Sequence, residues 1–399
     1  MKRIAWLSLS MLLLLALALP MAAQKADGSH IYAYPPIRIV DVQQDSSTPH
    51  GYVPAAMKAA YGFNGVPNGG AGQIIGIVDA FDDPNAEADL QVYDTQFGLP
   101  VCTTANGCFT KLKVGNPPGD SGWGLEISLD IQQAHSLAPA AKVLLVEANS
   151  NSFDDLLAAV DAARMNGATQ ISMSWSGGED SSELGFDSFF NHPGVTFMAS
   201  TGDGGHGVGY PAASPYVVAV GGTHLTLLAT VTIPSSISYS NYVSETGWVG
   251  SGGGISTIEP GQSYQNGVFA GCGTSGHRCV PDISSDADPN TGVPVYDTYG
   301  EPMWIQVGGT SVSSPDWSAI FAITNSSRAA AGKGTLQTAI ADLYSFYNMT
   351  QYNDFHDITS GTNGSCGSQC TAVAGYDLVT GIGSPKVNKL VPAFVAIEP

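Results

Sequence analysis

The chain has 399 residues, of which 34 are acidic and 14 basic, so its net charge at neutral pH is −20. So acidic a surface repels phosphate backbones and anionic lipids, which disfavours nucleic-acid and membrane partners. Only 12% of the residues are charged and 48 are glycine. This composition indicates a folded chain with many tight turns around a sizeable core, and it argues against disorder.

The first residues have the layout of a cleaved export signal. Met-Lys-Arg is followed by an almost wholly apolar run from Ile4 to Leu19 and then by small residues up to Ala23. We therefore predict a signal peptide over residues 1–23 and a secreted, extracellular protein; a retained N-terminal anchor is the alternative. Residues 24–50 read as a short polar lead, too short for a large prodomain, and residues 51–399 as one folded domain.

The six cysteines form three pairs that are close in sequence. In an exported protein this spacing favours three small disulfide loops, although six cysteines allow 15 pairings. The expected pairs are Cys102 with Cys108, Cys272 with Cys279, and Cys366 with Cys370. None of them has the CxxC spacing that would favour a metal cluster.

Strand-like and helix-like segments alternate through the first half of the chain. This alternation predicts an α/β fold whose mostly parallel central sheet carries helices on both faces, with ligands at the carboxyl ends of the strands. The expected strands are 73–79, 142–147, 169–175, 195–200 and 216–220, and the expected helices are 124–135 and 153–166. After Ser251 the sequence becomes rich in Gly, Pro and Ser, with one further helix expected from about Ser313 to Ala331.

Two segments carry candidate chemistry. Gly308-Gly-Thr-Ser311 precedes a helix, and a serine at a helix N-terminus lies where orphan amides favour developing negative charge. Glu126 and Asp130 are four residues apart on an expected helix, hence on one face, where two like charges repel. The pair can be two solvated acids or two carboxyls that share a proton.

Together these segments resemble the sedolisin (serine-carboxyl) peptidases, which are relatives of subtilisin in fold. The resemblance covers residues 51–399 and rests on motifs in the same order: Glu126-xxx-Asp130, Ser200-Thr-Gly-Asp203-Gly, Ser251-Gly-Gly-Gly, Arg278-Cys-Val-Pro-Asp282, Gly308-Gly-Thr-Ser311 and Asp357-Ile-Thr-Ser-Gly. It implies that Ser311 is the nucleophile and Glu126 its base. It also implies that Asp130 orients Glu126 and that Asp203 donates a hydrogen bond to the oxyanion.

A carboxylate base implies an enzyme that works in acid. Glu126 must be ionised while Asp203 keeps its proton, so a bell-shaped pH profile with an acidic optimum is expected. A histidine base is the alternative, but His135 lies nine residues beyond Glu126 and faces another direction. Asp79 is interpreted as a substrate-cleft or structural residue, and His192, His206 and His224 are expected in loops or satisfied polar positions.

The resemblance also implies one bound calcium ion. Its ligands would be the carboxylates of Asp357 and Asp377 and the carbonyls of Ile358, Val373 and Gly375, a hard oxygen cage suited to Ca²⁺. An ordinary pair of Asp-rich turns is the alternative. The expected function is a monomeric endopeptidase acting on polypeptides.

Two other functions remain open, a tripeptidyl-type exopeptidase and a catalytically silent secreted binding protein. The segment from Ser172 to Gly178 resembles the strand that lines the pocket for the residue before the scissile bond. Asp316, acidic where relatives are apolar, could perturb the surroundings of Ser311.

Overall fold

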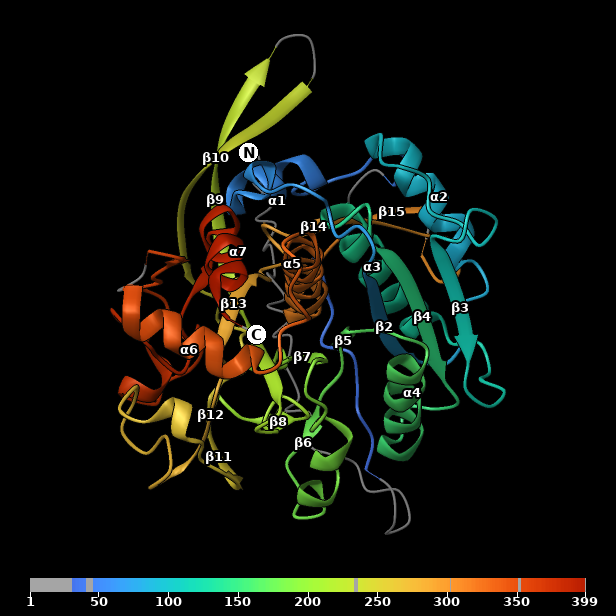
Figure 1. Ribbon diagram of the computed structural model, residues 1–399. Coiled ribbons are helices and arrows are strands. Elements are labelled where there is room, and N and C mark those ends of the chain that lie inside the picture. Colours follow the sequence, from blue (N-terminus) through green and yellow to red (C-terminus); the bar gives the residue numbers. More distant parts are fainter. Residues whose placement is uncertain (1–30, 41–45, 233–235, 302, 351–352, 399) are drawn as a thin grey trace, which may run out of the picture.

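The fold is built on one large twisted sheet (Figure 1). The computed structural model describes residues 31–40, 46–232, 236–301, 303–350 and 353–398, so the predicted export signal lies outside the described residues. The sheet has eight strands in the order β10-β9-β7-β5-β2-β4-β3, with β13 beside β9. Their bounds are β2 (Ile74–Ala80), β3 (Phe109–Lys113), β4 (Lys142–Ala148), β5 (Gln170–Met173), β7 (Thr196–Ser200), β9 (Val217–Thr232), β10 (Ser236–Gly247) and β13 (Ile283–Asp286).

Within this sheet only β9 and β10 pair antiparallel, among the strands that the structure describes. Side chains of successive strand residues enter different cores, as the pleat requires: Val143 packs into one hydrophobic cluster and Leu144 into the other. α4 (Phe153–Met165) covers one face, while α3 (Ser121–Leu137) and α5 (Thr310–Ala330) cover the other. The predicted mostly parallel α/β sheet with helices on both faces is confirmed.

Smaller elements surround this core. The remaining helices are α1 (Pro54–Tyr61), α2 (Ala86–Phe97), α6 (Ala339–Thr350) and α7 (Val387–Ala396), with 3-10 turns at Phe63–Gly65, Glu183–Gly185, Asp187–Phe189, Ser263–Gln265 and Gly367–Cys370. A second sheet has the order β1-β15-β14, formed by β1 (Arg38–Ile39), β15 (Met303–Gly308) and β14 (Val293–Asp297). Two-stranded ladders join β6 (Gly177–Gly178) to β8 (Gly209–Tyr210), β11 (Gly254–Pro260) to β12 (His277–Val280), and β16 (Phe355–His356) to β17 (Ser384–Pro385).

Two sequence expectations need correction. The helix expected from about Ser313 begins at Thr310, so Ser311 lies in its first turn and Pro315 lies inside the helix. The earlier start follows from Asp203, whose carboxylate accepts the Thr310 amide and satisfies one orphan donor of the first turn. The lead before residue 51 is also part of the fold, because β1 pairs with β15.

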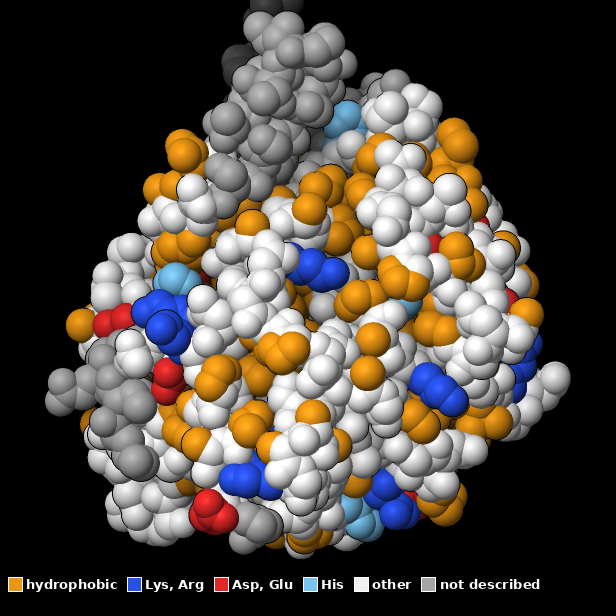
Figure 2. Space-filling view, turned by 45° about the horizontal axis from the view of Figure 1, so that its top comes forward, with side chains coloured by type: hydrophobic (Ala, Val, Ile, Leu, Met, Phe, Trp, Pro, Cys, Tyr) orange, Lys and Arg blue, Asp and Glu red, His pale blue; other side chains and the backbone are white. Residues whose placement is uncertain are grey.

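The three predicted cysteine pairs are disulfide-bonded: Cys102 with Cys108, Cys272 with Cys279, and Cys366 with Cys370. None of the helices among the described residues combines the length and the apolar character needed to cross a bilayer. Charged side chains are scattered singly or in small groups over the face seen in Figure 2, between apolar and neutral polar ones.

An acidic cluster lies beside β6 and β11. Its members Glu183 and Glu259 are buried. The third, Asp187, is half-buried and accepts hydrogen bonds from the Ser214 hydroxyl (2.7 Å) and the Tyr210 hydroxyl (3.2 Å). Burial, reinforced by the neighbouring acids, raises the pKa of Glu183 and of Glu259 to about 8. These carboxyls are therefore protonated in acid and must ionise inside the protein at higher pH.

We predict that the folded state is most stable in acid. A carboxyl whose pKa is raised on folding adds stability that is fully present below its unfolded pKa of about 4 and is lost as the pH rises through about 8. The melting temperature of the chain, measured by calorimetry from pH 4 to 8, should therefore fall across this window. Glu259→Gln, which cannot ionise, should flatten the fall, and Glu398→Gln at an exposed site should leave it unchanged. An unaltered slope in Glu259→Gln would contradict the prediction.

Candidate active site

The predicted acid pair lies on α3, and both side chains are completely buried. The helix begins where the Asp120 carboxylate caps the amide of Trp123 at 3.0 Å, and it then runs against α5 (Figure 1). Glu126 and Asp130 are one turn apart and share one face. Ser311 lies in the first turn of α5 and is fully buried as well.

Ser174, which follows β5, links these two helices. Its hydroxyl donates to Asp130 Oδ1 at 2.9 Å and lies 3.4 Å from the carbonyl oxygen of Ser311. Both carboxylate oxygens of Glu126 and the Ser311 hydroxyl are buried and make no regular hydrogen bond to a described residue. The Ser311 hydroxyl is nevertheless close enough to Glu126 to lower its pKa. The structure thus brings Glu126, Asp130 and Ser311 into one cluster.

A third carboxyl belongs to the same cluster. Burial raises the pKa of Glu126 well above its usual range, and the next largest cause is the charge of Asp79, at the end of β2. The same two causes raise the pKa of Asp130. Asp79 was interpreted from sequence only as a cleft or structural residue. The sequence feature that could have indicated its place in the cluster is the apolar strand that ends in an aspartate. The carboxyl end of such a strand lies at the edge of the sheet where ligands bind.

Asp203 approaches Ser311 from the loop after β7. Its Oδ1 accepts the amide (2.8 Å) and the hydroxyl (3.1 Å) of Thr310, the residue just before Ser311. Burial raises the pKa of Asp203 to about 7, although the charge of Arg38 lowers it. Below that pH the carboxyl is protonated and can donate a hydrogen bond.

Gly309 leaves room for a carbonyl oxygen beside Asp203. Its φ is +109°, a conformation that glycine adopts readily. A methyl group at this position would lie 2.1 Å from the carbonyl oxygen of Pro36 and 2.7 Å from Asp203 Oδ2. Both oxygens therefore border the same small space next to Ser311, and only a residue without a side chain fits there.

An extended segment of the lead crosses this part of the molecule. Tyr34 exchanges two backbone hydrogen bonds with Ser176, at 3.0 and 3.1 Å. The Ser311 amide donates to the carbonyl oxygen of Pro36 at 3.4 Å, and Arg38 pairs with Gly308 in the β1–β15 ladder. The segment predicted from Ser172 to Gly178 therefore lies beside Ser311 and pairs with an extended chain.

Two of the histidines considered from the sequence have partners outside this cluster. His135 is buried on α3, 2.8 Å from the carbonyl oxygen of Pro100, and His224 is 2.9 Å from Asp288. Asp316 is also turned away from Ser311: its charge raises the pKa of Tyr61 and of Tyr93. The expected effect of Asp316 on the surroundings of Ser311 has no support in these contacts.

The predicted calcium ligands come from two segments that meet. The Gly375 amide donates to Asp357 at 3.1 Å, and the Val373 amide donates to Asp377 at 3.0 Å. Ile358 is buried, and burial raises the pKa of both carboxyls, that of Asp377 to about 6. A carboxylate that burial makes costly to ionise gains from a bound cation, so the hard oxygen donors of this site fit Ca²⁺.

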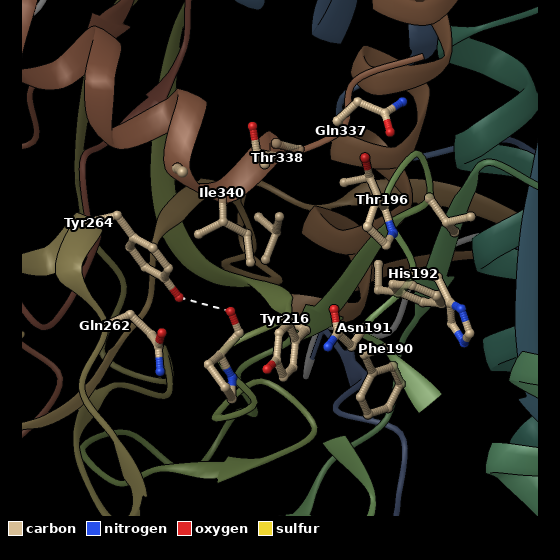
Figure 3. A pocket seen from close by; sticks show the side chains of 17 residues that line it. Phe190, Asn191, His192, Thr196, Tyr216, Gln262, Tyr264, Gln337, Thr338 and Ile340 are labelled. Atoms are coloured by element: carbon tan, nitrogen blue, oxygen red, sulfur yellow. Dashed lines mark hydrogen bonds between the residues drawn. The ribbon is translucent and has the colours of Figure 1, made fainter. Parts of the chain in front are cut away.

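A separate cavity of about 280 Å³ lies at the other end of β7 (Figure 3). Thr196, which begins this strand, lines it together with His192, Tyr216 and Ile340, whereas Ser200 and the loop to Asp203 follow the opposite end. A hydrogen bond of 2.9 Å from the Tyr264 hydroxyl to Pro215 crosses one wall. None of the predicted catalytic or calcium residues lines this cavity.

Comparisons with known proteins identify the family of the chain. Residues 108–352 match the family described as the subtilase family. The chain is 31% identical to kumamolisin from Bacillus sp. (strain MN-32), over 89% of this chain and 66% of that protein, and 27% identical to sedolisin from Pseudomonas sp. (strain 101), over 86% and 61%. It thus spans slightly less than two thirds of these relatives.

A shorter match joins it to tripeptidyl-peptidase sed1 of Aspergillus fumigatus, at 31% identity over 47% of this chain and 30% of the relative. Among solved structures, Pseudomonas sedolisin complexed with two molecules of pseudo-iodotyrostatin superposes with a TM-score of 0.72. The identity to it is 27%, over 86% of this chain and 98% of that one. The chain therefore belongs to the subtilase family, on its sedolisin branch.

Proposed function

We propose that the chain is an acid-active serine-carboxyl endopeptidase. The observation that carries the proposal is the shared burial of Glu126, Asp130 and Ser311 where α3 and α5 meet. A serine hydroxyl becomes a nucleophile when an adjacent base removes its proton, and Glu126 is the carboxyl whose pKa the Ser311 hydroxyl affects. The match to sedolisin and kumamolisin supports the same chemistry.

In this mechanism Ser311 attacks the substrate carbonyl carbon while Glu126 takes the hydroxyl proton. Asp130, held by Ser174, orients Glu126. The oxyanion that forms accepts hydrogen bonds from the Ser311 amide and from protonated Asp203. Glu126 then returns the proton to the leaving amine, which leaves an acyl group on Ser311. A water molecule next gives a proton to Glu126 and attacks the acyl carbon, and Glu126 passes that proton to the Ser311 oxygen as the acid product leaves.

The cleft favours an endopeptidase over a tripeptidyl peptidase. The lead passes Ser311 at Pro36, and the domain still binds it more than three residues toward its N-terminus. There Ala33 donates its amide to the Asn151 carbonyl at 2.9 Å, and Tyr32 bridges to Ser152. A substrate therefore has room to extend beyond three residues on this side. Blocking the amino terminus of a peptide substrate should leave its cleavage intact, whereas a tripeptidyl peptidase would lose it.

Secretion and polypeptide substrates complete the proposal. The apolar segment from Ile4 to Leu19 and the three disulfides support export. The monomeric state remains a prediction from the sequence. A catalytically silent protein would have the same buried acids but would not cleave peptides. The activity measurements described below distinguish it from a peptidase.

The pH dependence of kcat/KM on a denatured protein substrate tests the mechanism. Activity should peak in acid and fall as the pH rises through about 7, because Asp203 then loses the proton that it donates. Asp203→Asn keeps a donor that cannot titrate, so this alkaline limb should disappear even though the rate is lower. A rate maximum above pH 7 in the wild type would contradict the assignment.

Ser311→Ala and Glu126→Gln should each lower kcat/KM by roughly 10⁴-fold, since nucleophile and base act as a unit. Ser313→Ala is the matched control for the serine: it is buried on the same helix but contacts only the carbonyl oxygens of Ser285 and Asp286. Glu259→Gln is the matched control for the buried acid. Full activity in Glu126→Gln would refute its role as the base.

We further propose that one calcium ion binds the site defined by Asp357 and Asp377. Calcium would join the two segments that carry these residues and stabilise the fold. Micromolar to millimolar Ca²⁺ should raise the melting temperature of the protein, with Mg²⁺ less effective. Asp357→Asn should lower the calcium affinity at least ~10-fold, while exposed Asp154→Asn should not; equal calcium responses in both variants would rule the site out.

A further inference from the structure

The loop that carries Asp203 is held in place by main-chain groups of other segments. This oxyanion loop, defined as residues 201–207, contains four glycines, so its own side chains do little to fix its shape. Beyond Asp203, Gly207 exchanges two backbone hydrogen bonds with Gly253, both of 2.9 Å. The position of the acid therefore depends on the segments that pack against the loop.

Asn363 joins the oxyanion loop to one of these segments. Its side chain is buried, its backbone carbonyl accepts the His206 amide at 2.7 Å, and its side-chain amide donates to the Ser251 carbonyl at 2.9 Å. A methyl group on Gly205 would lie only 2.6 Å from the same Asn363 carbonyl oxygen. Asn363 thus contacts the oxyanion loop directly, within three residues of Asp203.

The Cys366–Cys370 disulfide closes the turn that begins at Asn363. The Asn363 amide donates to the Cys370 carbonyl at 3.1 Å, so the two ends of this disulfide turn, residues 363–370, meet. A methyl group on Gly364 would lie 2.9 Å from Cys370 Sγ and 3.2 Å from the Cβ atom of His206. The disulfide turn therefore packs on the oxyanion loop.

One sulfur of this disulfide is open to solvent. Residues 364–369 are all exposed, so packing contributes little to the shape of the turn and the cross-link holds its ends together. All six cysteines lie within the described residues, and of these Cys366 alone is exposed. It is the sulfur that an external thiolate reaches first.

From these contacts we infer that Asn363 and the Cys366–Cys370 disulfide position the oxyanion acid, and that opening the disulfide slows peptide cleavage. The inference rests on the proposed peptidase function and adds the residues that hold its oxyanion donor. An external dithiol opens the bond in two exchange steps: the two sulfurs of the dithiol become joined, and Cys366 and Cys370 each receive a hydrogen. Asn363 then loses its fixed position, and Asp203 loses the support of the main chain beyond it.

Steady-state kinetics on a peptide substrate in acid test the inference. Cys366→Ser/Cys370→Ser should lower kcat by ~10- to 100-fold and leave KM within about two-fold, because the donor acts on charge that develops in the transition state. Cys102→Ser/Cys108→Ser is the matched control. It also opens a short loop, with a sequence separation of 6 instead of 4, but Cys102 contacts Asp94 on α2, so kcat should not change.

A double-mutant cycle shows whether the disulfide acts through Asp203. In an Asp203→Ala chain the donor is already absent, so removing the Cys366–Cys370 disulfide should lower kcat much less than it does in the wild type. The same fold loss in both backgrounds would overturn the inference. So would an unchanged kcat in Cys366→Ser/Cys370→Ser when the wild type is active.

Reduction of the wild type keeps the test decisive if the double serine variant does not fold. After timed exposure to dithiothreitol at pH 7, labelling with iodoacetamide should modify Cys366 and Cys370 before the other cysteines, and the loss of rate in acid should follow this label. Loss of rate that follows the labelling of another pair would contradict the inference.

Hydrogen exchange on Ser311→Ala chains needs no catalysis and separates the two proposals. The His206 amide should exchange at least ~10-fold faster when the Cys366–Cys370 disulfide is absent, because its acceptor is no longer fixed. Unchanged exchange would overturn the inference. Faster exchange together with no peptide cleavage by the chain that retains Ser311 would refute the proposed peptidase function, while the role of the disulfide in holding the loop stood.

Discussion

The burial of carboxyl groups in contact with one another is the constraint on which the site depends. Glu126, Asp130 and Asp79 are all completely buried, and the charge of Asp79 raises the pKa of both Glu126 and Asp130 beyond the effect of burial. Removing a carboxylate from water is expensive, so the cluster holds protons to a higher pH than free acids do. When one member loses its proton, its neighbours keep theirs, and the ionised member can then accept a proton from a hydroxyl. The protons belong to the cluster as a whole, which is why its titration is described by macroscopic steps.

The fold supplies this constraint through two helices that meet over the carboxyl ends of parallel strands. α3 presents the acids, α5 presents Ser311, and the loop after β7 brings Asp203 to the first turn of α5. Asp203 has two roles that depend on separate oxygens. Its Oδ1 caps the helix through Thr310, and its Oδ2 faces the space that Gly309 keeps open. The helix cap therefore fixes the position of the oxygen that would carry the donated proton.

Much of this arrangement could be predicted from the sequence because it is local. The spacing of Glu126 and Asp130 places them on one helix face, and Gly309 before Ser311 signals a backbone that must admit another group. Contacts between residues that are far apart in the chain leave no pattern of this kind in the sequence. Ser174 bonds to Asp130 from 44 positions away in the chain, and Asp79 joins the acids because α3 packs against β2. The sequence also suggested a helix start three residues too late, since the cap comes from a residue more than a hundred positions away.

The lead before residue 51 shows most clearly why sequence patterns alone fell short. Two prolines in a polar stretch before the folded domain are typical of a linker, because proline neither donates to a ladder nor continues a helix. Here the two prolines lie between a stretch that pairs with Ser176 and one that pairs with Gly308, and the Pro36 carbonyl accepts the Ser311 amide. Whether such a segment is a linker or pairs as a strand depends on what lies opposite it. The physical information is therefore in the residues that face the segment, because the backbone groups of Ser176 and Gly308 can pair with an extended chain of any sequence.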